Sequence, residues 1–401
     1  MANRRGVSSD NIPNNPVINN LNSLLQDIYV RYVALNDDEF ETYYGVFTDV
    51  FRQIHTKMKQ VDPYFERYSS NVLLAGSHYD RTRVTKPDEF DVAIVIGLPL
   101  NERAHPEDVA LVPKEAGYVH LRMGTQYKQL MMRDSCNWEI NNAAYKWSDG
   151  QDFLLRSYFM DWFKGVVDIA LNLFKRGSTP IIYSGDVPYT IRQSESGPAK
   201  TLIIENISKG FKLDVDLVPA LKFPEERWPI TNSYRLIRAN WSNAEKFWLV
   251  VPKQNKNAGN DTSRYWRLGL VFKINIHLLL KKLRDAQDMD KIASYFLKNL
   301  VLWEIVEREH DRDFWTQNPA ALFTILVRKL YNALKTGKLL YFWNSKDNLF
   351  TNIHPWTLSS YAAKLERLLE VLARPGSYKE VAKYLLTASQ FHEYNYKFLH
   401  I

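Results

Sequence analysis

The sequence predicts an α+β fold with two lobes: a mixed β-sheet lobe that carries a long N-terminal helix, and a C-terminal helical lobe. Three observations support this fold class. Apolar side chains recur at helical spacing over residues 17–68, short apolar runs that suit strands follow from residue 72, and helical patterns return from residue 268 onward. A chain of 401 residues can bury one large core or two lobes that share an interface, and we expect two lobes.

The N-terminal helix is expected within residues 17–68, after an Asn-rich segment, residues 1–16, that we expect to be a flexible tail. Its apolar side chains recur at three- and four-residue steps, and the first proline of the helical segment is Pro63. One long helix fits this pattern, and so do two helices with a break near residues 36–38.

Strands are expected in several separate parts of the chain. Apolar runs at residues 72–75 and 92–96 are bounded by glycine and proline, and further strand-like runs occur at residues 202–207 and 211–217. Helical spacing returns between them, over residues 148–173. The predicted sheet is therefore assembled from pieces that lie far apart in the sequence.

The C-terminal part of the chain is expected to be mostly helical after a polar, exposed loop at residues 253–263. The strongest helical patterns fall at residues 276–283, 295–306, 320–334 and 361–372. We place the lobe boundary after residue 267, so that the sheet lobe covers residues 17–267 and the helical lobe covers residues 268–401.

Composition excludes some classes of protein and favours others. The single cysteine, Cys136, forms no intrachain disulfide and cannot build a zinc-thiolate site, so we expect no zinc. A formal charge of +7 and a pI near 9.1 favour an anionic partner, although a solvated basic surface explains the same surplus. No run of about 18 apolar residues or leader pattern is apparent, so we expect no membrane insertion and a cytoplasmic location.

Carboxylates alternate with apolar residues in two of the predicted strands. Glu89 and Asp91 are two residues apart and share one face of a strand, and Asp214 and Asp216 do the same in another. Neighbouring carboxylates repel one another unless a cation neutralises them, and oxygen ligands of this kind suit magnesium. Solvated acids on an exposed strand edge are the alternative, and spacing does not choose between Asp214 and Asp216.

A glycine-serine pair, Gly76-Ser77, directly follows the first of these apolar runs. Glycine lets the backbone approach a ligand closely, and free N–H groups with a serine hydroxyl can hold a phosphate. A plain turn is the alternative for this pair.

These motifs occur together in one order, which resembles the nucleotidyltransferase superfamily. Gly76-Ser77 is followed by Glu89-x-Asp91 twelve residues later and by a distant aspartate in an apolar strand. The residues from Gly76-Ser77 to Glu89-Phe90-Asp91-Val92 resemble, more closely, the cyclic GMP-AMP synthase-like receptors of animals. Further matching motifs extend this resemblance over about residues 71–351. These motifs are Trp266-Arg267-Leu268, Leu279-Leu280-Lys281, Asp290-Lys291, Ser294-Tyr295-x-x-Lys298 and Asn348-Leu349-Phe350.

The resemblance implies a bilobal nucleotidyltransferase fold with the active site on the sheet. It makes Gly76 and Ser77 contacts of a nucleotide triphosphate. It makes Glu89, Asp91 and Asp216 the catalytic ligands of two Mg²⁺ ions, for which Mn²⁺ can substitute. It also places Asp216 near the acceptor hydroxyl, so that the choice between the two aspartates of that strand falls on Asp216.

The resemblance also assigns nucleotide contacts near the lobe boundary. Lys281 and Ser294 are implied as phosphate contacts, Arg267 as a base or phosphate contact, and Tyr295 as the ring on which a base stacks; Lys298 belongs to the same motif. Each has a simpler reading from the sequence alone. Tyr295 suits the core at a lobe interface, and Arg267 and Lys281 suit surface charges.

The activity implied is synthesis of a cyclic GMP-AMP-type dinucleotide from ATP and GTP, as an innate immune second messenger made on binding nucleic acid. This chain lacks the His and Cys zinc insertion of the family's vertebrate DNA sensor and has Gly269 where that sensor has serine. We therefore expect double-stranded RNA as the activator, and a ligand other than nucleic acid is the alternative. For the activity, the alternatives are a transferase that makes a linear oligonucleotide and an inactive family member that acts as a nucleic-acid-binding scaffold. A ligand-induced dimer is also left open.

Two basic segments are candidates for the nucleic-acid surface. Arg52, Lys57 and Lys59 lie along neighbouring faces of the N-terminal helix together with His55, and the loop at residues 253–264 carries further cations. Such clusters bind phosphates without reading sequence. The alternative is the ordinary solvated face of a helix.

Overall fold

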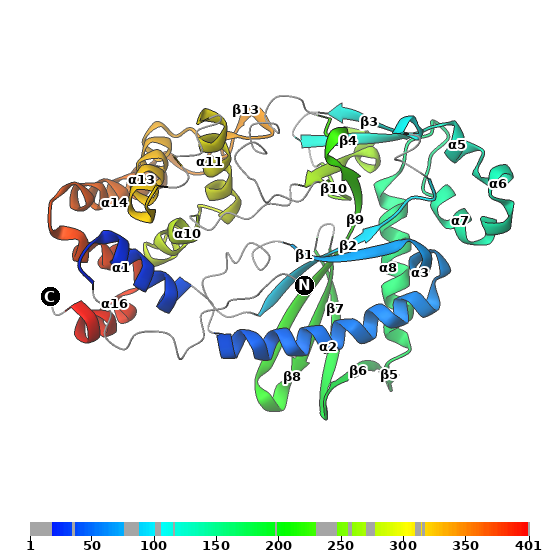
Figure 1. The fold of residues 1–401 in the computed structure, drawn as a ribbon, viewed down its shortest axis with the longest axis horizontal. Helices are drawn as coiled ribbons and strands as arrows, with labels where there is room; N and C mark the ends of the chain where they lie inside the picture. The colour runs from blue at the N-terminus through cyan, green and yellow to red at the C-terminus, as the bar shows by residue number, and fades with distance from the viewer. Residues whose placement is uncertain are drawn as a thin grey trace.

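The computed structural model has two lobes that lie side by side, one built on a large sheet and one built of helices (Figure 1). Each lobe has its own hydrophobic core. The structure describes residues 18–33, 37–75, 88–100, 106–114, 117–196, 199–229, 247–255, 259–269, 277–308, 314 and 317–399. The expected tail at residues 1–16 lies outside them.

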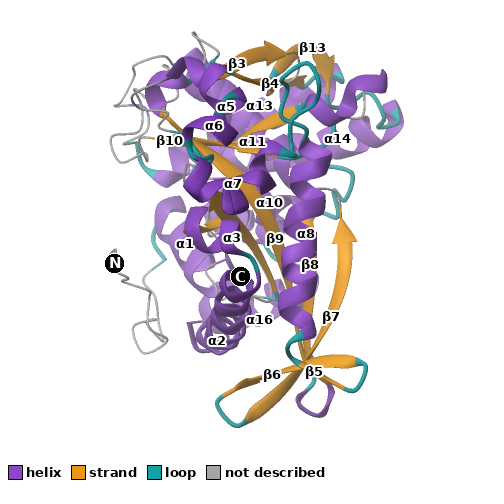
Figure 2. Cartoon of the chain, turned by 90° about the vertical axis from the view of Figure 1, so that its right-hand side faces the viewer, coloured by secondary structure: helices purple, strands orange, loops and turns teal. Residues whose placement is uncertain are grey.

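The sheet lobe is organised around one long strand, β9 (Phe211–Pro224). It runs parallel to β2 (Glu89–Ile96) and antiparallel to β8 (Ala199–Asn206) and β10 (Phe247–Val251), within an eleven-stranded sheet in the described part of the chain. The far end of the sheet, seen at the bottom of Figure 2, is the hairpin of β5 (Lys175–Arg176) and β6 (Thr179–Ser184). The other strands are β1 (Ser69–Ala75), β3 (Val109–Lys114), β4 (Tyr118–Met123), β5 (Lys175–Arg176), β6 (Thr179–Ser184), β7 (Val187–Ser196) and β11 (Trp266–Gly269).

Two long helices, α2 (Asp37–Val61) and α8 (Arg156–Asn172), cover one face of this sheet. Phe90, the residue between Glu89 and Asp91 on β2, is fully buried and stacks on Phe47 of α2 at 4.7 Å between ring centroids. Because successive strand residues face opposite ways, Glu89 and Asp91 lie on the face away from α2. The helices of this lobe are α2 (Asp37–Val61), α3 (Pro63–Tyr68), α5 (Thr125–Lys128), α6 (Leu130–Arg133), α7 (Trp138–Tyr145) and α8 (Arg156–Asn172).

The helical lobe contains all four helices expected in the C-terminal part of the chain: α10 (His277–Ala286), α11 (Ser294–Glu307), α13 (Pro319–Thr336) and α14 (Pro355–Ala373). It also holds α15 (Ala382–Leu385), α16 (Ala388–Tyr394), a π-helix (Asn395–Leu399) and the hairpin of β12 (Leu340–Tyr341) and β13 (Asn344–Asn348). The helical lobe also has a 3₁₀-helix at Ser377–Val381. The other 3₁₀-helices of the described residues belong to the sheet lobe, at Pro106–Asp108, Ser135–Asn137, Ile207–Lys209, Glu225–Arg227 and Gly259–Arg264. No helix among the described residues is long and apolar enough to cross a membrane.

The N-terminal helical segment is divided between the two lobes. Helix α1 (Leu21–Ile28), continued by a π-helix (Tyr29–Val33), buries Leu24 and Leu25 in the core of the helical lobe. The hydroxyl of Tyr394 on α16 donates a hydrogen bond to Asp27 of α1 at 2.5 Å. Helix α2, in contrast, packs in the core of the sheet lobe. The structure thus contradicts the expected extent of the sheet lobe, residues 17–267, because the apolar face of α1 is buried against the C-terminal helices.

Two other predictions from the sequence need correction. The helix expected over residues 148–173 begins only at Arg156, because Asp149 accepts hydrogen bonds from the N–H groups of Gln151 and Phe153 and closes a turn before it. The exposed loop expected at residues 253–263 includes Asn255, which is buried, and ends in the 3₁₀-helix Gly259–Arg264.

Aromatic side chains join the two lobes. Trp343, in the β12–β13 hairpin of the helical lobe, lies 5.7 Å from Trp228 of the sheet lobe between ring centroids. It also packs on Gly117, where a Cβ atom would come within 2.8 Å of the indole ring. Glycine at residue 117, with φ of +72°, therefore allows the hairpin to approach the sheet lobe.

Candidate active site

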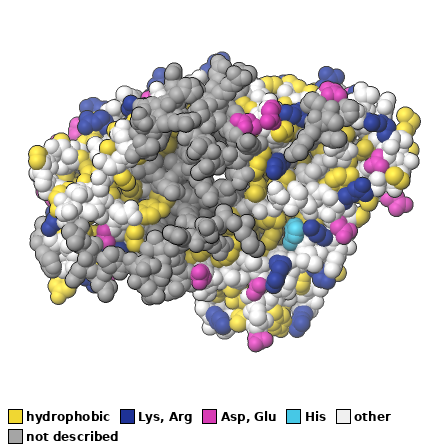
Figure 3. Space-filling model, viewed as in Figure 1, with side chains coloured by type: hydrophobic (Ala, Val, Ile, Leu, Met, Phe, Trp, Pro, Cys, Tyr) yellow, Lys and Arg dark blue, Asp and Glu magenta, His cyan; other side chains and the backbone are white. Residues whose placement is uncertain are grey.

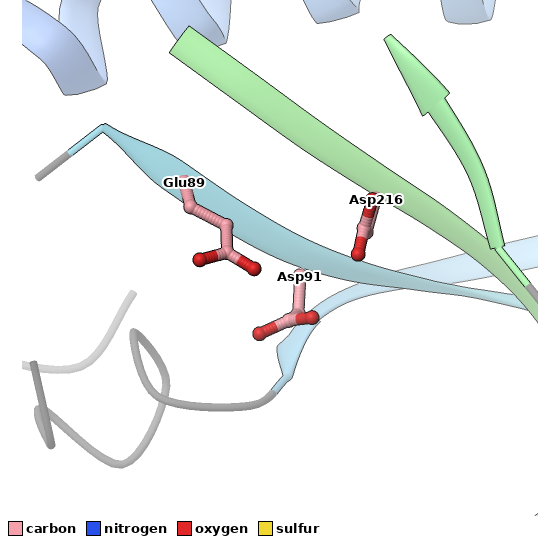
Figure 4. Close-up of side chains that lie close together, drawn as sticks. All are labelled: Glu89, Asp91 and Asp216. Carbon is pink, nitrogen blue, oxygen red and sulfur yellow. The ribbon is translucent and has the colours of Figure 1, made fainter. Parts of the chain in front are cut away.

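Three carboxylates gather on the face of the sheet that α2 leaves uncovered. One carboxylate oxygen each from Glu89, Asp91 and Asp216 lies within 4.8 Å of the other two (Figure 4). All three side chains are half-buried. In the described part of the chain this is the one place where three acidic, His or Cys ligand atoms come together. The hard oxygen donors at this spacing fit a divalent cation such as Mg²⁺.

Sheet register explains which aspartate of β9 joins this cluster. In the parallel pairing of β2 with β9, Asp91 is opposite Asp216 and Glu89 is opposite Asp214. Asp214 instead lies 3.4 Å from the ammonium group of Lys212, measured from Nζ to Oδ2. The geometry therefore favours Asp216 over Asp214 as the third ligand.

Residue Thr201 of β8, which sequence reasoning missed, contacts the acidic cluster. It is opposite Asp216 in the antiparallel β8–β9 pair, and its hydroxyl donates to Asp216 Oδ1 at 2.5 Å. A signal was present in the sequence, because a tight turn at Gly210 joins two predicted strands and sets which residues face each other.

Arg267 and Tyr295 come together from different lobes. The Arg267 guanidinium of β11 lies 5.1 Å from the ring centroid of Tyr118 and 5.2 Å from that of Tyr341. Burial lowers the pKa of Arg267, an effect that the nearby Tyr118 opposes. Burial raises the pKa of Tyr295, and the nearby Arg267 charge opposes that rise. Tyr295 is 54% exposed, which leaves it accessible to a base.

The other expected nucleotide contacts lie on α10 and α11. Ser294, the first residue of α11, accepts a hydrogen bond from Arg284 at 2.9 Å, which leaves its hydroxyl proton able to donate to a ligand. Lys281 lies on α10, and Lys298 follows Ser294 by one helical turn on α11.

The glycine-serine pair expected to hold the triphosphate, Gly76 and Ser77, lies outside the described residues. The strand that leads to it, β1, ends at Ala75, which pairs with Asp91 of β2. Ala75, the residue before the pair in the sequence, therefore lies opposite one of the three acids.

The expected nucleic-acid residues of α2 lie on the other side of the sheet from the acids. The Arg52 side chain is 71% exposed and forms an ion pair with Asp49 at 3.1 Å, and Lys57 donates to Gln60. Lys59 is half-buried. His55 packs between Phe51 and Phe65, and burial, with a smaller effect of the Lys59 charge, lowers its pKa. His55 is therefore neutral at pH 7 and adds no positive charge here.

The second basic candidate, the loop at residues 253–264, is partly neutralised. Arg264 forms an ion pair with Asp149 at 2.6 Å, and its guanidinium lies 4.6 Å from the Phe153 ring centroid. On the face shown in Figure 3, Lys and Arg side chains are spread over both lobes and interspersed with Asp and Glu. This distribution does not single out one basic patch on that face.

Two family models, both of Mab-21 protein domains, match this chain. The model of the Mab-21 protein nucleotidyltransferase domain matches residues 78–274, which contain all three acids. The model of the Mab-21 protein HhH/H2TH-like domain matches residues 273–367 in the helical lobe. The chain therefore belongs to the Mab-21 nucleotidyltransferase family, and its fold is that of a nucleotidyltransferase with a C-terminal helical domain.

Individual proteins similar to this chain are cyclic GMP-AMP synthase-like receptors. The chain is 28% identical to a cyclic GMP-AMP synthase-like receptor of Ctenocephalides felis over 94% of this chain and 90% of that protein. It is 29% identical to one of Microplitis demolitor over 90% and 67% respectively. It is 23% identical to cyclic GMP-AMP synthase-like receptor 1 of Drosophila melanogaster over 83% and 87%. The resemblance to this receptor group, expected from the motifs, is confirmed.

Proposed function

We propose that this nucleotidyltransferase makes a cyclic GMP-AMP-type dinucleotide from ATP and GTP when it binds double-stranded RNA, and that it acts in innate immune signalling. The observation that carries the proposal is the acidic cluster of Glu89, Asp91 and Asp216 on one face of the sheet. The names of the receptors that the chain resembles supply the type of product. We also propose that the protein works in the cytoplasm.

The acidic cluster would supply the ligands of a two-metal centre. Three carboxylates on one face repel one another, and cations between them remove that cost. Bound Mg²⁺ ions, or Mn²⁺ in their place, would polarise the reacting phosphate, activate the acceptor hydroxyl and neutralise the leaving pyrophosphate. Glu89 and Asp91 come from β2 and Asp216 from β9, so the paired strands fix their spacing.

The reaction is nucleotidyl transfer, repeated once to close the ring. The acceptor hydroxyl oxygen bonds to the α-phosphorus of a nucleoside triphosphate, the bond to pyrophosphate breaks, and the hydroxyl proton leaves to a base. We place the Asp216 carboxylate beside the acceptor hydroxyl, where it orients the attacking oxygen. A second transfer in the opposite direction joins the two nucleotides in a ring.

The nucleotides would be held between the lobes. Arg267 and Tyr295 approach each other from β11 and α11, so a base stacked on the exposed ring of Tyr295 would lie beside the Arg267 charge. Ser294, Lys281 and Lys298 would contact phosphate from the helical lobe, and Gly76 and Ser77, which follow β1 in the sequence, would contact it from the sheet lobe.

The activating surface is proposed on α2, through Arg52, Lys57 and Lys59. An A-form duplex can be recognised by its shape and backbone without sequence readout. Because α2 and the acids lie on opposite faces of the sheet, RNA bound there would act on catalysis through the fold instead of touching the reacting groups. A ligand-induced dimer is compatible with this arrangement.

The test is one reaction run in parallel with different ligands. Purified protein, ATP, GTP and Mg²⁺ are incubated with duplex RNA, duplex DNA or no ligand, and products are treated with phosphatase and analysed by mass spectrometry. The proposal predicts a phosphatase-resistant cyclic dinucleotide that appears with RNA only. A phosphatase-sensitive product would indicate a linear oligonucleotide, and no product with any ligand, even in Mn²⁺, would indicate an inactive scaffold.

A further inference from the structure

We propose that Thr201 is a positioning residue that orients the Asp216 carboxylate and thereby sets the metal affinity of the acidic cluster. This inference rests on the proposed metal centre. Its basis is the hydroxyl of Thr201, which donates to Asp216 Oδ1 at 2.5 Å from the directly opposite position on β8. The Thr201 side chain is buried, with 9% of its surface exposed, so water competes little for this hydrogen bond.

The hydrogen bond addresses a specific difficulty of the cluster. The terminal torsion of an aspartate is soft, and like charges on Glu89 and Asp91 favour rotation of Asp216 away from them. A hydroxyl donor on one oxygen fixes the plane of the carboxylate and leaves further lone-pair positions for a cation. Hydrogen-bonded partners of metal ligands commonly tune metal affinity in this way.

The backbone around Thr201 holds it in place. Its neighbour Lys200 faces the opposite side of β8, where its ammonium group lies 2.9 Å from Asp168 of α8. This ion pair, in which the Lys200 side chain is buried and the Asp168 side chain is 46% exposed, ties β8 to α8, while the Thr201 side chain points to the acids. The position of the hydroxyl is therefore set by the sheet and by a helix packed behind it.

The second aspartate of β9 provides an internal comparison. Asp214 is also on this face, but the residue opposite it on β8 is Ile203, which has no donor. Asp214 lies near Lys212 and outside the acidic cluster. Of these two aspartates, the one that joins the cluster is the one with a hydroxyl partner across the strand.

The test compares Thr201→Val, which keeps the shape and removes the hydroxyl, with Thr201→Ser, which keeps the hydroxyl. Thr190→Val is the matched control, because Thr190 on β7 donates to the backbone carbonyl of Glu205 at 3.2 Å in the same sheet. Binding of Mn²⁺ to each nucleotide-free protein is measured by the electron paramagnetic resonance of the free ion, and thermal unfolding checks the fold.

We expect Thr201→Val to weaken Mn²⁺ binding about 10- to 100-fold. Thr201→Ser and Thr190→Val should bind within a few-fold of the parent. In turnover, Thr201→Val should raise the half-saturating Mg²⁺ concentration and recover most of kcat at saturating Mg²⁺. Unchanged Mn²⁺ affinity in Thr201→Val would overturn the positioning role, even if the variant unfolds at a lower temperature.

Failure of this inference can be told apart from failure of the proposed activity. If the parent protein makes no cyclic dinucleotide but Thr201→Val still weakens Mn²⁺ binding, the positioning role stands and the product assignment fails. If Asp91→Asn binds Mn²⁺ as well as the parent does, the metal does not bind at the acidic cluster, and both claims fall.

Discussion

The acidic face of the sheet and the basic face of helix α2 differ in how firmly the fold fixes their side chains. Asp91 and Asp216 are opposite each other in paired strands, and Thr201 holds Asp216 from a third strand. Arg52 and Lys57, in contrast, are long side chains on a helix surface, and their described partners are residues of the same helix three positions away.

This difference separates two kinds of function. A metal centre needs ligands at fixed distances, and the strand register supplies them. Binding of a nucleic-acid backbone needs positive charge but tolerates mobile side chains, because the attraction comes from phosphates along the whole duplex. The comparison therefore predicts that single substitutions will be severe at the acids and that several must be combined on α2.

The largest effect is expected for Asp91→Asn. Removing one carboxylate charge weakens metal capture and should cost about 3 kcal/mol or more of transition-state stabilisation, on the order of a hundredfold in turnover. The unfolding temperature should stay the same or rise, since repulsion within the cluster is relieved. Turnover within a few-fold of the parent in Mg²⁺ would show that the assigned metal site is wrong.

The next effect is loss of activation when Arg52, Lys57 and Lys59 are all changed to Glu. Affinity should fall alike for all duplex RNA sequences, and the dependence of affinity on salt should become shallower by about 0.9 per lost phosphate contact. Basal turnover in Mn²⁺ without RNA should survive. A normal response to RNA would move the activating surface elsewhere, first to the loop at residues 253–264.

A smaller effect is expected for Tyr295→Ala, which should raise KM for nucleotide and spare RNA binding. Base stacking on an aromatic ring contributes about 1–3 kcal/mol, which corresponds to roughly 5- to 150-fold in affinity. Tyr295→Phe keeps the ring and should retain a KM close to that of the parent. Equal KM values in all three proteins would place the base away from Tyr295.

The smallest effect is expected for zinc removal. With Mg²⁺ kept in excess, a zinc-selective chelator should change neither activity nor the unfolding temperature, because the one cysteine of the chain cannot build a thiolate site. The exposed Cys136 should likewise tolerate Cys136→Ser. Loss of activity on zinc removal would require a zinc site made of other ligands.

The spacing of apolar and polar residues along the chain correctly predicted the strands and helices that depend only on neighbouring residues. The alternation of Glu89, Phe90 and Asp91 correctly indicated a strand with acids on one face and a buried ring on the other. The four C-terminal helices were also predicted from apolar spacing alone. Both features follow from the periods of strand and helix, which the sequence carries directly.

Features that depend on long-range packing were not predictable in this way. Helix α1 has the same amphipathic pattern whichever lobe buries it, and only the tertiary contacts place it with the C-terminal helices. The choice of Asp216 over Asp214 depends on the register between β2 and β9, and spacing within β9 cannot supply it. The cation–π contacts of Arg267 with Tyr118 and Tyr341 join three distant segments.

The most direct test of the account is a side-by-side comparison of Asp216→Asn and Asp214→Asn. Both substitutions remove one charge from the same face of β9, so they differ mainly in whether the residue belongs to the acidic cluster. Turnover of ATP and GTP with Mg²⁺ and duplex RNA is measured for both, together with Mn²⁺ binding. We expect Asp216→Asn to lose turnover and Mn²⁺ binding and Asp214→Asn to keep both within a few-fold; the reverse pattern would contradict the assigned centre.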